Sequence, residues 1–196
     1  MGMRPFAGVQ ALAGTAQPVF GTASTAAFTP SVDPFSNKLG PGSNQTQVTV
    51  AVTSTKGFLP GKVVAVGPGS AFNPSATSPV QLDIGVVKKI IDSTHLVIQG
   101  LQNAHASGDW VVLNDTVGNV HIRPVVTTAA AYIGDASTVA AGDQSVMDVL
   151  PIVAAGAAPG YVFDAESIGQ SQPFNLSQFW IIGTAADTFV ARYTEI

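Results

Sequence analysis

The chain contains no cysteine and is poor in charge. The missing thiols exclude a disulfide scaffold, a thiolate metal site and a cysteine nucleophile. Only 10% of the 196 residues are charged, whereas a typical soluble domain has about 25%. Hydrophobic residues reach 46%, which argues against disorder, since disordered chains combine high charge with low hydropathy. A surface built mainly from neutral residues repels its neighbours weakly, so we expect the chain to associate.

Basic residues are also scarce. Eight Lys and Arg are outnumbered by twelve Asp and Glu, which gives a net charge of -4 and a pI near 5.1. Nucleic-acid binding needs a basic surface, so no nucleic-acid partner is expected. The one basic pair, Lys88-Lys89, would point to opposite faces of a regular strand. The longest apolar stretch, VLPIVAAGAAPG, is too short and too rich in Gly and Pro to cross a bilayer, so no membrane partner is expected either.

Residues 1–45 form a proline-rich segment that excludes a long helix or a central strand. One interpretation is a disordered linker. Linkers, however, usually lack large apolar side chains, and this segment contains Phe6, Val9, Leu12, Val19, Phe20, Phe28, Phe35 and Leu39.

Ordering such a segment costs more conformational entropy than the burial of these side chains returns. A neighbouring molecule would supply the difference if the segment added strands to it. We therefore predict that residues 1–45 are an extended docking arm. Its predicted partner-binding residues are Phe6, Phe20, Phe28, Phe35 and Leu39.

From residue 46 the pattern changes to alternation. The stretch QTQVTVAVT places Val48, Val50 and Val52 on one face of a strand. Further strand-like runs follow, and turn signals recur about every ten residues, a rhythm typical of small antiparallel barrels and sandwiches. Residues 46–125 are therefore predicted to form a small antiparallel β-barrel.

Residues 126–196 are predicted to form a second, sandwich-like unit with strands in AAYIG, QSVMDVLPIV, GYVFDAES, FWIIG and TFVARYTEI. QPFNLSQF is compatible with one short helical turn. Residues 183–187 are predicted to close a hairpin between strands 179–182 and 189–193. Both strands are apolar on both faces, so both should be covered on both faces. The expected fold class is all-β: an extended N-terminal arm, a small β-barrel or sandwich, and a second antiparallel β-sandwich-like unit.

Residues that carry catalysis are sparse. Apart from Asp92 near His95 and Asp109 near His105, the histidines, including His121, have no potential ligand at the spacing of a zinc site. Both acids occur in turn-like stretches, where Asp is favoured by local backbone hydrogen bonds. We therefore expect turns there, with His95 facing solvent.

Motifs for hydrolysis and phosphate binding are incomplete. GQSQP at 169–173 ends on proline where the nucleophile elbow of a serine hydrolase needs a small residue. GPGSAFNP lacks the Lys-Ser/Thr of a phosphate loop. Asp135 and Asp143 leave a structural cation open as an alternative. No catalytic, cofactor-binding or metal-binding residue is predicted, and the chain is not expected to be an enzyme.

Several aromatic residues are candidates for a sugar-binding face, because sugars stack on rings. They are Trp110, Trp180, Tyr132, Tyr161 and Tyr193. Trp110 in GDWVVLND is the best candidate, although a tryptophan among valines on a strand is more often part of a core.

The low charge, the absent cysteine, the proline-rich arm and strands such as SGDWVVLND and FWIIGTAADTFVARY resemble virion structural proteins of tailed bacteriophages. Capsid decoration (cement) proteins are the most similar among them. The resemblance implies a β-rich homotrimer that binds the outer capsid surface at junctions between major capsid subunits and stabilises the shell. Its implied partners are the major capsid protein and other copies of the chain. Its implied location is the outer surface of the virion, after synthesis in the host cytoplasm.

Two other functions stay open. One is a fibre-associated or receptor-binding module in which Trp110 or Tyr161 contacts a glycan. The other is a β-rich hydrolase that uses a carboxylate such as Asp164 or Glu166.

Overall fold

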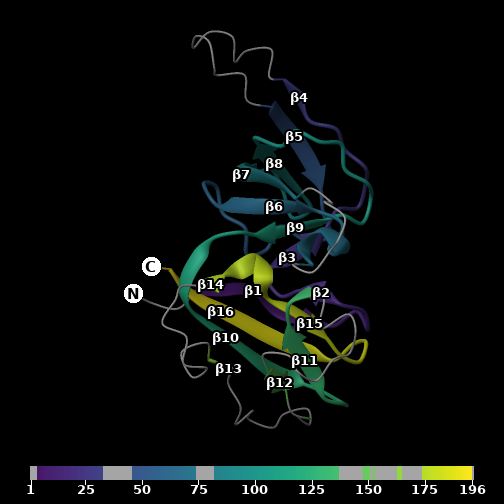
Figure 1. The fold of residues 1–196 in the computed structure, drawn as a ribbon, viewed down its shortest axis with the longest axis vertical. Helices are drawn as coiled ribbons and strands as arrows, with labels where there is room; N and C mark the ends of the chain where they lie inside the picture. The colour runs from purple at the N-terminus through teal and green to yellow at the C-terminus, as the bar shows by residue number, and fades with distance from the viewer. Residues whose placement is uncertain are drawn as a thin grey trace.

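The structure, a computed structural model, describes residues 4–32, 46–73, 82–136, 148–150, 152, 163–164 and 174–195. The described chain consists of β-strands with short 3₁₀ turns such as η2 (Gly69–Phe72) and η4 (Leu176–Gln178), which confirms the predicted all-β class. The turn η4 lies in the stretch where a short helical turn was expected. Two lobes lie one above the other in Figure 1. None of the helical segments in the described ranges has the length and apolarity needed to cross a membrane.

The upper lobe in Figure 1 is a curled antiparallel sheet with the strand order β3-β9-β6-β7-β8-β5-β4. Its strands are β3 (Gly21–Ala23), β4 (Ser31–Val32), β5 (Thr46–Ala51), β6 (Val63–Gly67), β7 (Asp83–Ile90), β8 (His95–Gln99) and β9 (Trp110–Leu113). Val50 and Val52 are fully buried, as the alternation of residues 45–53 predicts.

Strand β3, at one end of this sheet, also meets β5, the second strand from the other end. Ser24, after β3, forms a bridge with Val52, after β5. The N–H of Thr25 donates to the carbonyl of Ala51 at 2.8 Å, and the N–H of Thr53 donates to the carbonyl of Ala23 at 2.9 Å. The sheet of the upper lobe is therefore curled into a half-barrel, and we refer to this lobe as the barrel lobe.

The lower lobe contains two sheets, with the orders β1-β16-β10-β13 and β12-β11-β15-β2; β14 also pairs with β10. Their strands are β1 (Arg4–Ala11), β2 (Gln17–Pro18), β10 (Thr116–Val126), β11 (Ala131–Gly134), β12 (Asp148–Leu150), β13 (Phe163–Asp164), β14 (Phe174–Asn175), β15 (Trp180–Ile182) and β16 (Thr188–Glu195). Because β10 pairs with β16 along most of its length, the chain enters the lower lobe near residue 115. The predicted boundary between 125 and 126 is therefore wrong.

The strands β15 and β16 are consecutive in the chain but belong to different sheets. β15 pairs with β11 and β2, while β16 pairs with β1 and β10. The predicted hairpin is therefore wrong. The turn between them is fixed by other segments, since the Asp187 carboxylate accepts hydrogen bonds from the N–H and the hydroxyl of Thr128, both at 2.9 Å.

Strand β15 is covered on both faces, as its sequence predicts. Phe179 and Ile181 belong to the main core, whereas Trp180 packs in a smaller cluster beside Phe72 and Trp110. Strand β16 is covered mainly on one face, because its buried residues alternate with partly exposed ones.

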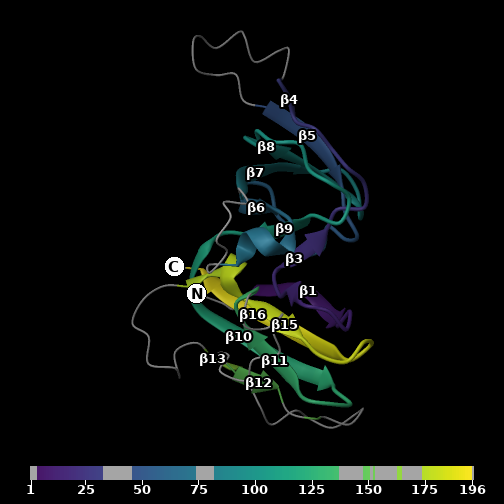
Figure 2. The same cartoon turned by 45° about the vertical axis from the view of Figure 1, so that its right-hand side comes forward.

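Residues 4–32 run through all three sheets (Figures 1 and 2). β1 pairs with β16, β2 with β15, β3 with β9 and β4 with β5. Phe6 and Phe20 are fully buried in the main core, and Phe28 is 9% exposed. The predicted docking arm is therefore wrong for these residues, because the hydrogen bonds and apolar contacts come from the same chain. Phe35 and Leu39 lie outside the described residues.

An aromatic cluster joins the two lobes. Phe20 contacts Phe6, Phe179 and Tyr193 edge to face, with ring centroids 5.5, 6.1 and 5.8 Å away, and Phe6 contacts Phe58 at 5.7 Å. Phe58 belongs to the barrel lobe, whereas Phe179 and Tyr193 belong to the lower lobe. Edge-to-face pairs add about 0.5–1.5 kcal/mol each to the effect of apolar burial. The lobes therefore share one hydrophobic core.

Gly57 makes room for this cluster. Its φ of +91° lies in the region that favours glycine. A methyl group at this position would lie 2.4 Å from the Phe6 ring. The approach of the barrel lobe to β1 therefore depends on a glycine here.

Replacing Phe20 with alanine is expected to lower the free energy of unfolding by about 3–5 kcal/mol, because the cavity would lie where both lobes meet. The matched control is Val9→Ala in the same segment, where a side chain that is 62% exposed should cost less than about 0.5 kcal/mol. Urea unfolding followed by circular dichroism measures both. Equal, small effects would contradict a core shared through residues 4–32.

Candidate functional site

Strand β1 runs along the boundary between the lobes, and its successive residues contribute to three different features there. At its start, Arg4 contacts Glu195 of an ionic cluster. Phe6 then enters the shared aromatic core. From Ala7 onwards, β1 and the chain after it line a groove. The groove is the candidate functional site. The ionic cluster and the shared aromatic core hold its walls in place.

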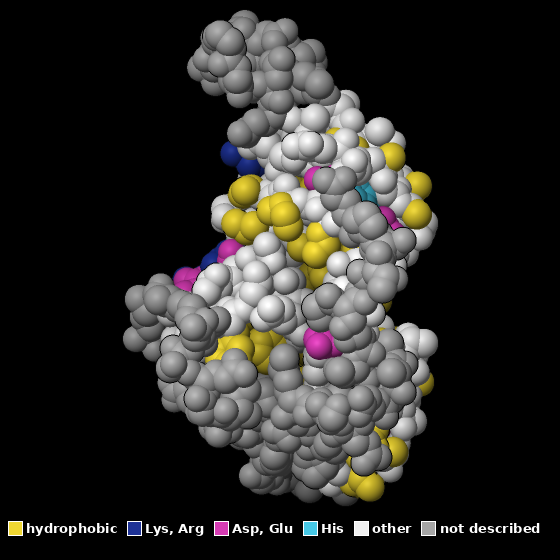
Figure 3. All heavy atoms as spheres, in the orientation of Figure 1, with side chains coloured by type: hydrophobic (Ala, Val, Ile, Leu, Met, Phe, Trp, Pro, Cys, Tyr) yellow, Lys and Arg dark blue, Asp and Glu magenta, His cyan; other side chains and the backbone are white. Residues whose placement is uncertain are grey.

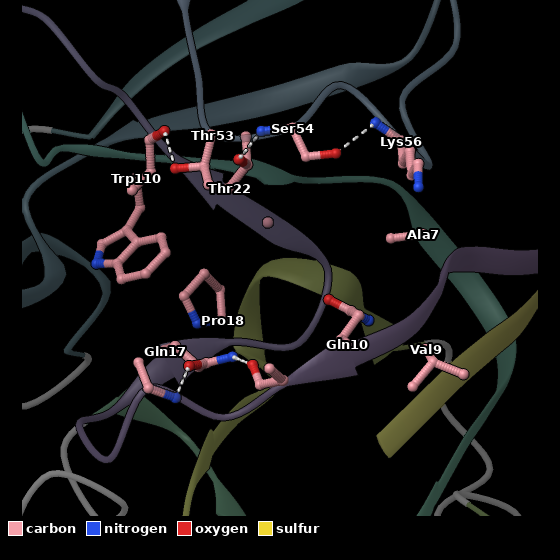
Figure 4. Close-up of a pocket in the computed structure, with 14 residues that line it drawn as sticks. Ala7, Val9, Gln10, Gln17, Pro18, Thr22, Thr53, Ser54, Lys56 and Trp110 are labelled. Atoms are coloured by element: carbon pink, nitrogen blue, oxygen red, sulfur yellow. Dashed lines mark hydrogen bonds between the residues drawn. The ribbon is translucent and has the colours of Figure 1, made fainter. Parts of the chain in front are cut away.

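The groove lies between β1 and β3 and has a volume of about 430 Å³. In Figure 4 the β1 wall carries Gln10 and Val9, and the opposite wall carries Thr53, Ser54 and Lys56. Trp110 lies at one end of the groove, opposite Pro18. The size falls within the range of about 300–1,000 Å³ that is usual for small-molecule sites.

A β-bulge bends the free edge of β1 at one end of the groove. The pairing of β1 with β16 shifts register between Phe6 and Val9. Ala7 and Gly8 between them have φ values of 56° and 75°, a region rarely used by a residue such as alanine. Bulges of this kind interrupt the ladder that another strand would need.

A side chain closes the same edge further along. The Gln17 carboxamide accepts a hydrogen bond from the N–H of Ala13 at 2.8 Å and donates one to the carbonyl of Ala11 at 3.1 Å. It therefore occupies the place of a peptide group from a neighbouring strand. Together with the bulge, it makes the groove a poor site for an added β-strand.

The opposite wall presents hydroxyl groups with hydrogen atoms to donate. Thr22 Oγ1 accepts from the N–H of Ser54 at 3.2 Å, and Ser54 Oγ accepts from the N–H of Lys56 at 3.2 Å. A hydroxyl that accepts one hydrogen bond keeps its own proton for another partner. Lys56 is exposed, and its ammonium forms no ion pair within the described chain.

Trp110 is only partly buried and also lines a second hollow of about 340 Å³. Its ring meets that of Trp180 edge to face, with centroids 6.0 Å apart. Trp180 is 2% exposed, and its Nε1–H donates to the carbonyl of Ser177 at 3.1 Å. The two tryptophans therefore differ: Trp180 is a core residue, whereas part of Trp110 faces the groove.

An ionic cluster fixes the boundary at the start of β1. Lys62, just before β6, lies 2.9 Å from Asp115 Oδ2 and donates a hydrogen bond to Glu195 Oε1; Arg4 Nε lies 3.6 Å from Glu195 Oε2. Burial lowers the pKa of Lys62, but the hydrogen bond to Glu195 and the contact with Asp115 outweigh it and raise the pKa above 10.5. The same hydrogen bond lowers the pKa of Glu195 below 4.5. Lys62 therefore clamps the barrel lobe to the lower lobe.

A buried polar cluster fixes the barrel lobe near β4. His105 Nδ1 lies 3.1 Å from Asp109 Oδ2, and Nε2 lies 3.4 Å from Asp83 Oδ2. All three side chains are almost fully buried. The His105 ring also lies against Phe28, with centroids 4.9 Å apart, and the two residues exchange backbone hydrogen bonds. The cluster therefore anchors the N-terminal segment to the barrel and has no access for a substrate.

The turn at Asp92 forms as predicted, and His95 is half-exposed. A backbone hydrogen bond from Thr94 and a side-chain hydrogen bond with His95 lower the pKa of Asp92 to about 2. Within the described ranges, no three His, Asp or Glu side chains form a metal-binding group. Tyr161, Asp143, Glu166 and the 169–173 stretch lie outside those ranges, as does the side chain of Asp164.

The clamp predicts a pH-dependent coupling between Lys62 and Glu195. Glu195 contributes fully above pH 4.5 and loses its contribution as the pH falls through its lowered pKa. Lys62 contributes fully below pH 10.5 and loses its contribution as the pH rises through its raised pKa. A double-mutant cycle of Lys62→Met and Glu195→Gln should give about 0.5–1.5 kcal/mol at neutral pH. The coupling should vanish when acid protonates Glu195; an unchanged coupling there would contradict the assignment.

Replacing His105 with alanine should lower the free energy of unfolding by about 3–5 kcal/mol, because two buried carboxylates lose their shared partner. His95→Ala is the control, since its half-exposed ring pairs with a solvated Asp92 and an exposed pair of this kind adds little to stability. Thermal and urea unfolding compare the two variants. Similar losses of unfolding free energy in the two variants would contradict the claim that the contribution of His105 depends on the burial of its cluster.

No protein-family model, curated protein or solved structure matches the chain.

Proposed function

We propose that the chain is a non-catalytic structural protein of a tailed bacteriophage that binds the outer capsid surface at junctions between major capsid subunits and stabilises the shell. The proposal starts from the resemblance of the sequence to capsid decoration proteins. It includes assembly with other copies of the chain as a homotrimer. Because residues 4–32 belong to the protein's own core, attachment uses the folded surface in place of an arm.

The observation that carries the proposal is the single core shared by both lobes. A protein that reinforces a shell must transmit force between the subunits that it contacts. Two lobes joined by aromatic packing, an ionic clamp and a strand segment common to all sheets resist separation. A rigid body loses little conformational entropy on attachment, which favours binding.

The barrel lobe carries an exposed apolar surface that suits attachment. Figure 3 shows hydrophobic side chains gathered on this lobe. Val63 of β6 pairs with Val86 of β7, and Ile84, two residues before Val86, lies on the same face. Ile84 is 47% exposed, and Leu59 in the turn before β6 is 43% exposed. We refer to Leu59, Val63, Ile84 and Val86 as the barrel patch.

Two lysines lie next to the barrel patch. Lys88 and Lys89 are both exposed. The pairing of β7 with β8 shifts register between Val87 and Lys89, so both side chains reach solvent where a regular strand would turn one inward. An apolar patch flanked by positive charge fits the mixed apolar and polar character of protein interfaces.

Changing Ile84 to aspartate should weaken binding to capsids at least about tenfold, because a charge would be buried in the interface. Ile152→Asp is the matched control, since Ile152 is 67% exposed and lies outside the barrel patch. Cosedimentation with capsids that lack this protein measures attachment, and circular dichroism verifies folding. Loss of binding in both variants, or in neither, would contradict attachment through the barrel patch.

A further inference from the structure

We propose that the groove between β1 and β3 binds a saccharide that carries a carboxylate group. This inference goes beyond capsid attachment and uses different residues from the barrel patch. It rests on the accessible indole of Trp110, the hydroxyl groups of the opposite wall and the positive charge of Lys56.

Trp110 supplies an apolar wall for a sugar ring. The indole is partly buried, lines the groove and lies opposite Pro18 (Figure 4). Sugar rings present C–H groups on their faces, and aromatic side chains combine large apolar area with a defined orientation. Trp180 contacts the Trp110 ring edge to face and restricts its movement. The platform is therefore fixed before a ligand arrives, which lowers the entropy cost of binding.

The polar groups of the groove match the hydroxyl groups of a sugar. Thr22 and Ser54 each accept a backbone hydrogen bond and keep a hydroxyl proton to donate. In Figure 4 the Gln10 side chain extends from β1 towards the groove. Its Nε2 donates a long hydrogen bond of 3.4 Å to the Val19 carbonyl, which leaves its Oε1 to accept. Donors and acceptors on both walls suit a ligand whose hydroxyl groups do both.

The charge of the groove selects an acidic ligand. Among the described residues that line it, Lys56 is charged and no Asp or Glu is present. A carboxylate on the ligand would therefore meet one cation and no repelling charge. Hydrogen bonds between an ammonium and a carboxylate are about twice as strong as neutral ones.

A peptide strand is a weaker candidate for this groove. An added strand would pair with the free edge of β1, but Gln17 occupies the Ala11 carbonyl and the Ala13 N–H. The bulge at Ala7 and Gly8 interrupts the edge on the other side. The backbone groups that strand addition requires are therefore engaged or misaligned.

Tryptophan fluorescence tests the proposal, because Trp110 and Trp180 are the two tryptophans of the chain. The full chain is titrated with trigalacturonic acid and 3′-sialyllactose, and with their uncharged counterparts, the methyl ester and lactose. We expect a saturable change with at least one acidic sugar, present in Trp180→Phe and absent in Trp110→Phe. Lys56→Met should weaken that binding about tenfold, while Lys89→Met, an exposed lysine outside the groove, should leave it unchanged.

Three results would overturn the proposal. The first is no saturable binding of either acidic sugar up to about 10 mM, a concentration that detects very weak binding. The second is binding that persists when isothermal titration calorimetry is repeated on Trp110→Ala. The third is equal affinity for the acidic and neutral sugars with no effect of Lys56→Met. Ile84→Asp should bind the sugar normally, so failure of capsid attachment and failure of this site are distinguishable.

Discussion

The pairing of residues 4–32 with three different sheets is the constraint on which the rest of the structure depends. Each short strand of this segment completes the edge of a sheet that is otherwise built from distant parts of the chain. Phe20 lies between β2 and β3. Its ring contacts Phe179 and Tyr193 of the lower lobe, while its carbonyl accepts a hydrogen bond from the N–H of Leu113 in the barrel lobe. Without this segment, the barrel lobe and the lower lobe would each expose a sheet edge and part of a hydrophobic core. The segment therefore acts within the molecule as a donated strand would act between molecules.

The functional surfaces follow from this arrangement. Because β1 runs along the boundary between the lobes, its start contributes to the ionic clamp and its end forms one wall of the groove. The other wall begins with β3, only ten residues after β1 ends. A single chain segment thus sets the spacing of both walls, and the shared core keeps that spacing constant. The barrel patch lies on β6, β7 and the turn before β6, so capsid attachment and ligand binding can occur through separate residues.

Several features of the fold could be predicted from sequence because they depend on local patterns. The alternation through Val50 and Val52 identifies a strand with one buried face, and the uniformly apolar β15 identifies a strand covered on both faces. The arm and the hairpin were predicted wrongly for a common reason. Phenylalanines spaced along a segment show that it packs against an apolar surface, but they do not show whether the same chain or another molecule provides that surface. Similarly, two strands that are consecutive in the chain need not pair with each other. Trp110 was identified from the sequence as a candidate for sugar binding, but the groove was missed because Gln10, Thr22 and Ser54 come from segments distant from it. Likewise Asp83 lies 22 residues from His105, with no spacing signal to link them.

Hydrogen exchange on a dilute, single copy of the chain tests the central claim most directly. The N–H of Leu12 donates to the carbonyl of Asp187 at 2.8 Å, and the N–H of Val19 donates to the carbonyl of Phe179 at 2.9 Å. If residues 4–32 are held by their own chain, these amides should exchange as slowly as those of β10 and β16, at every protein concentration. Fast exchange in the dilute monomer, with protection gained only on association, would contradict the account.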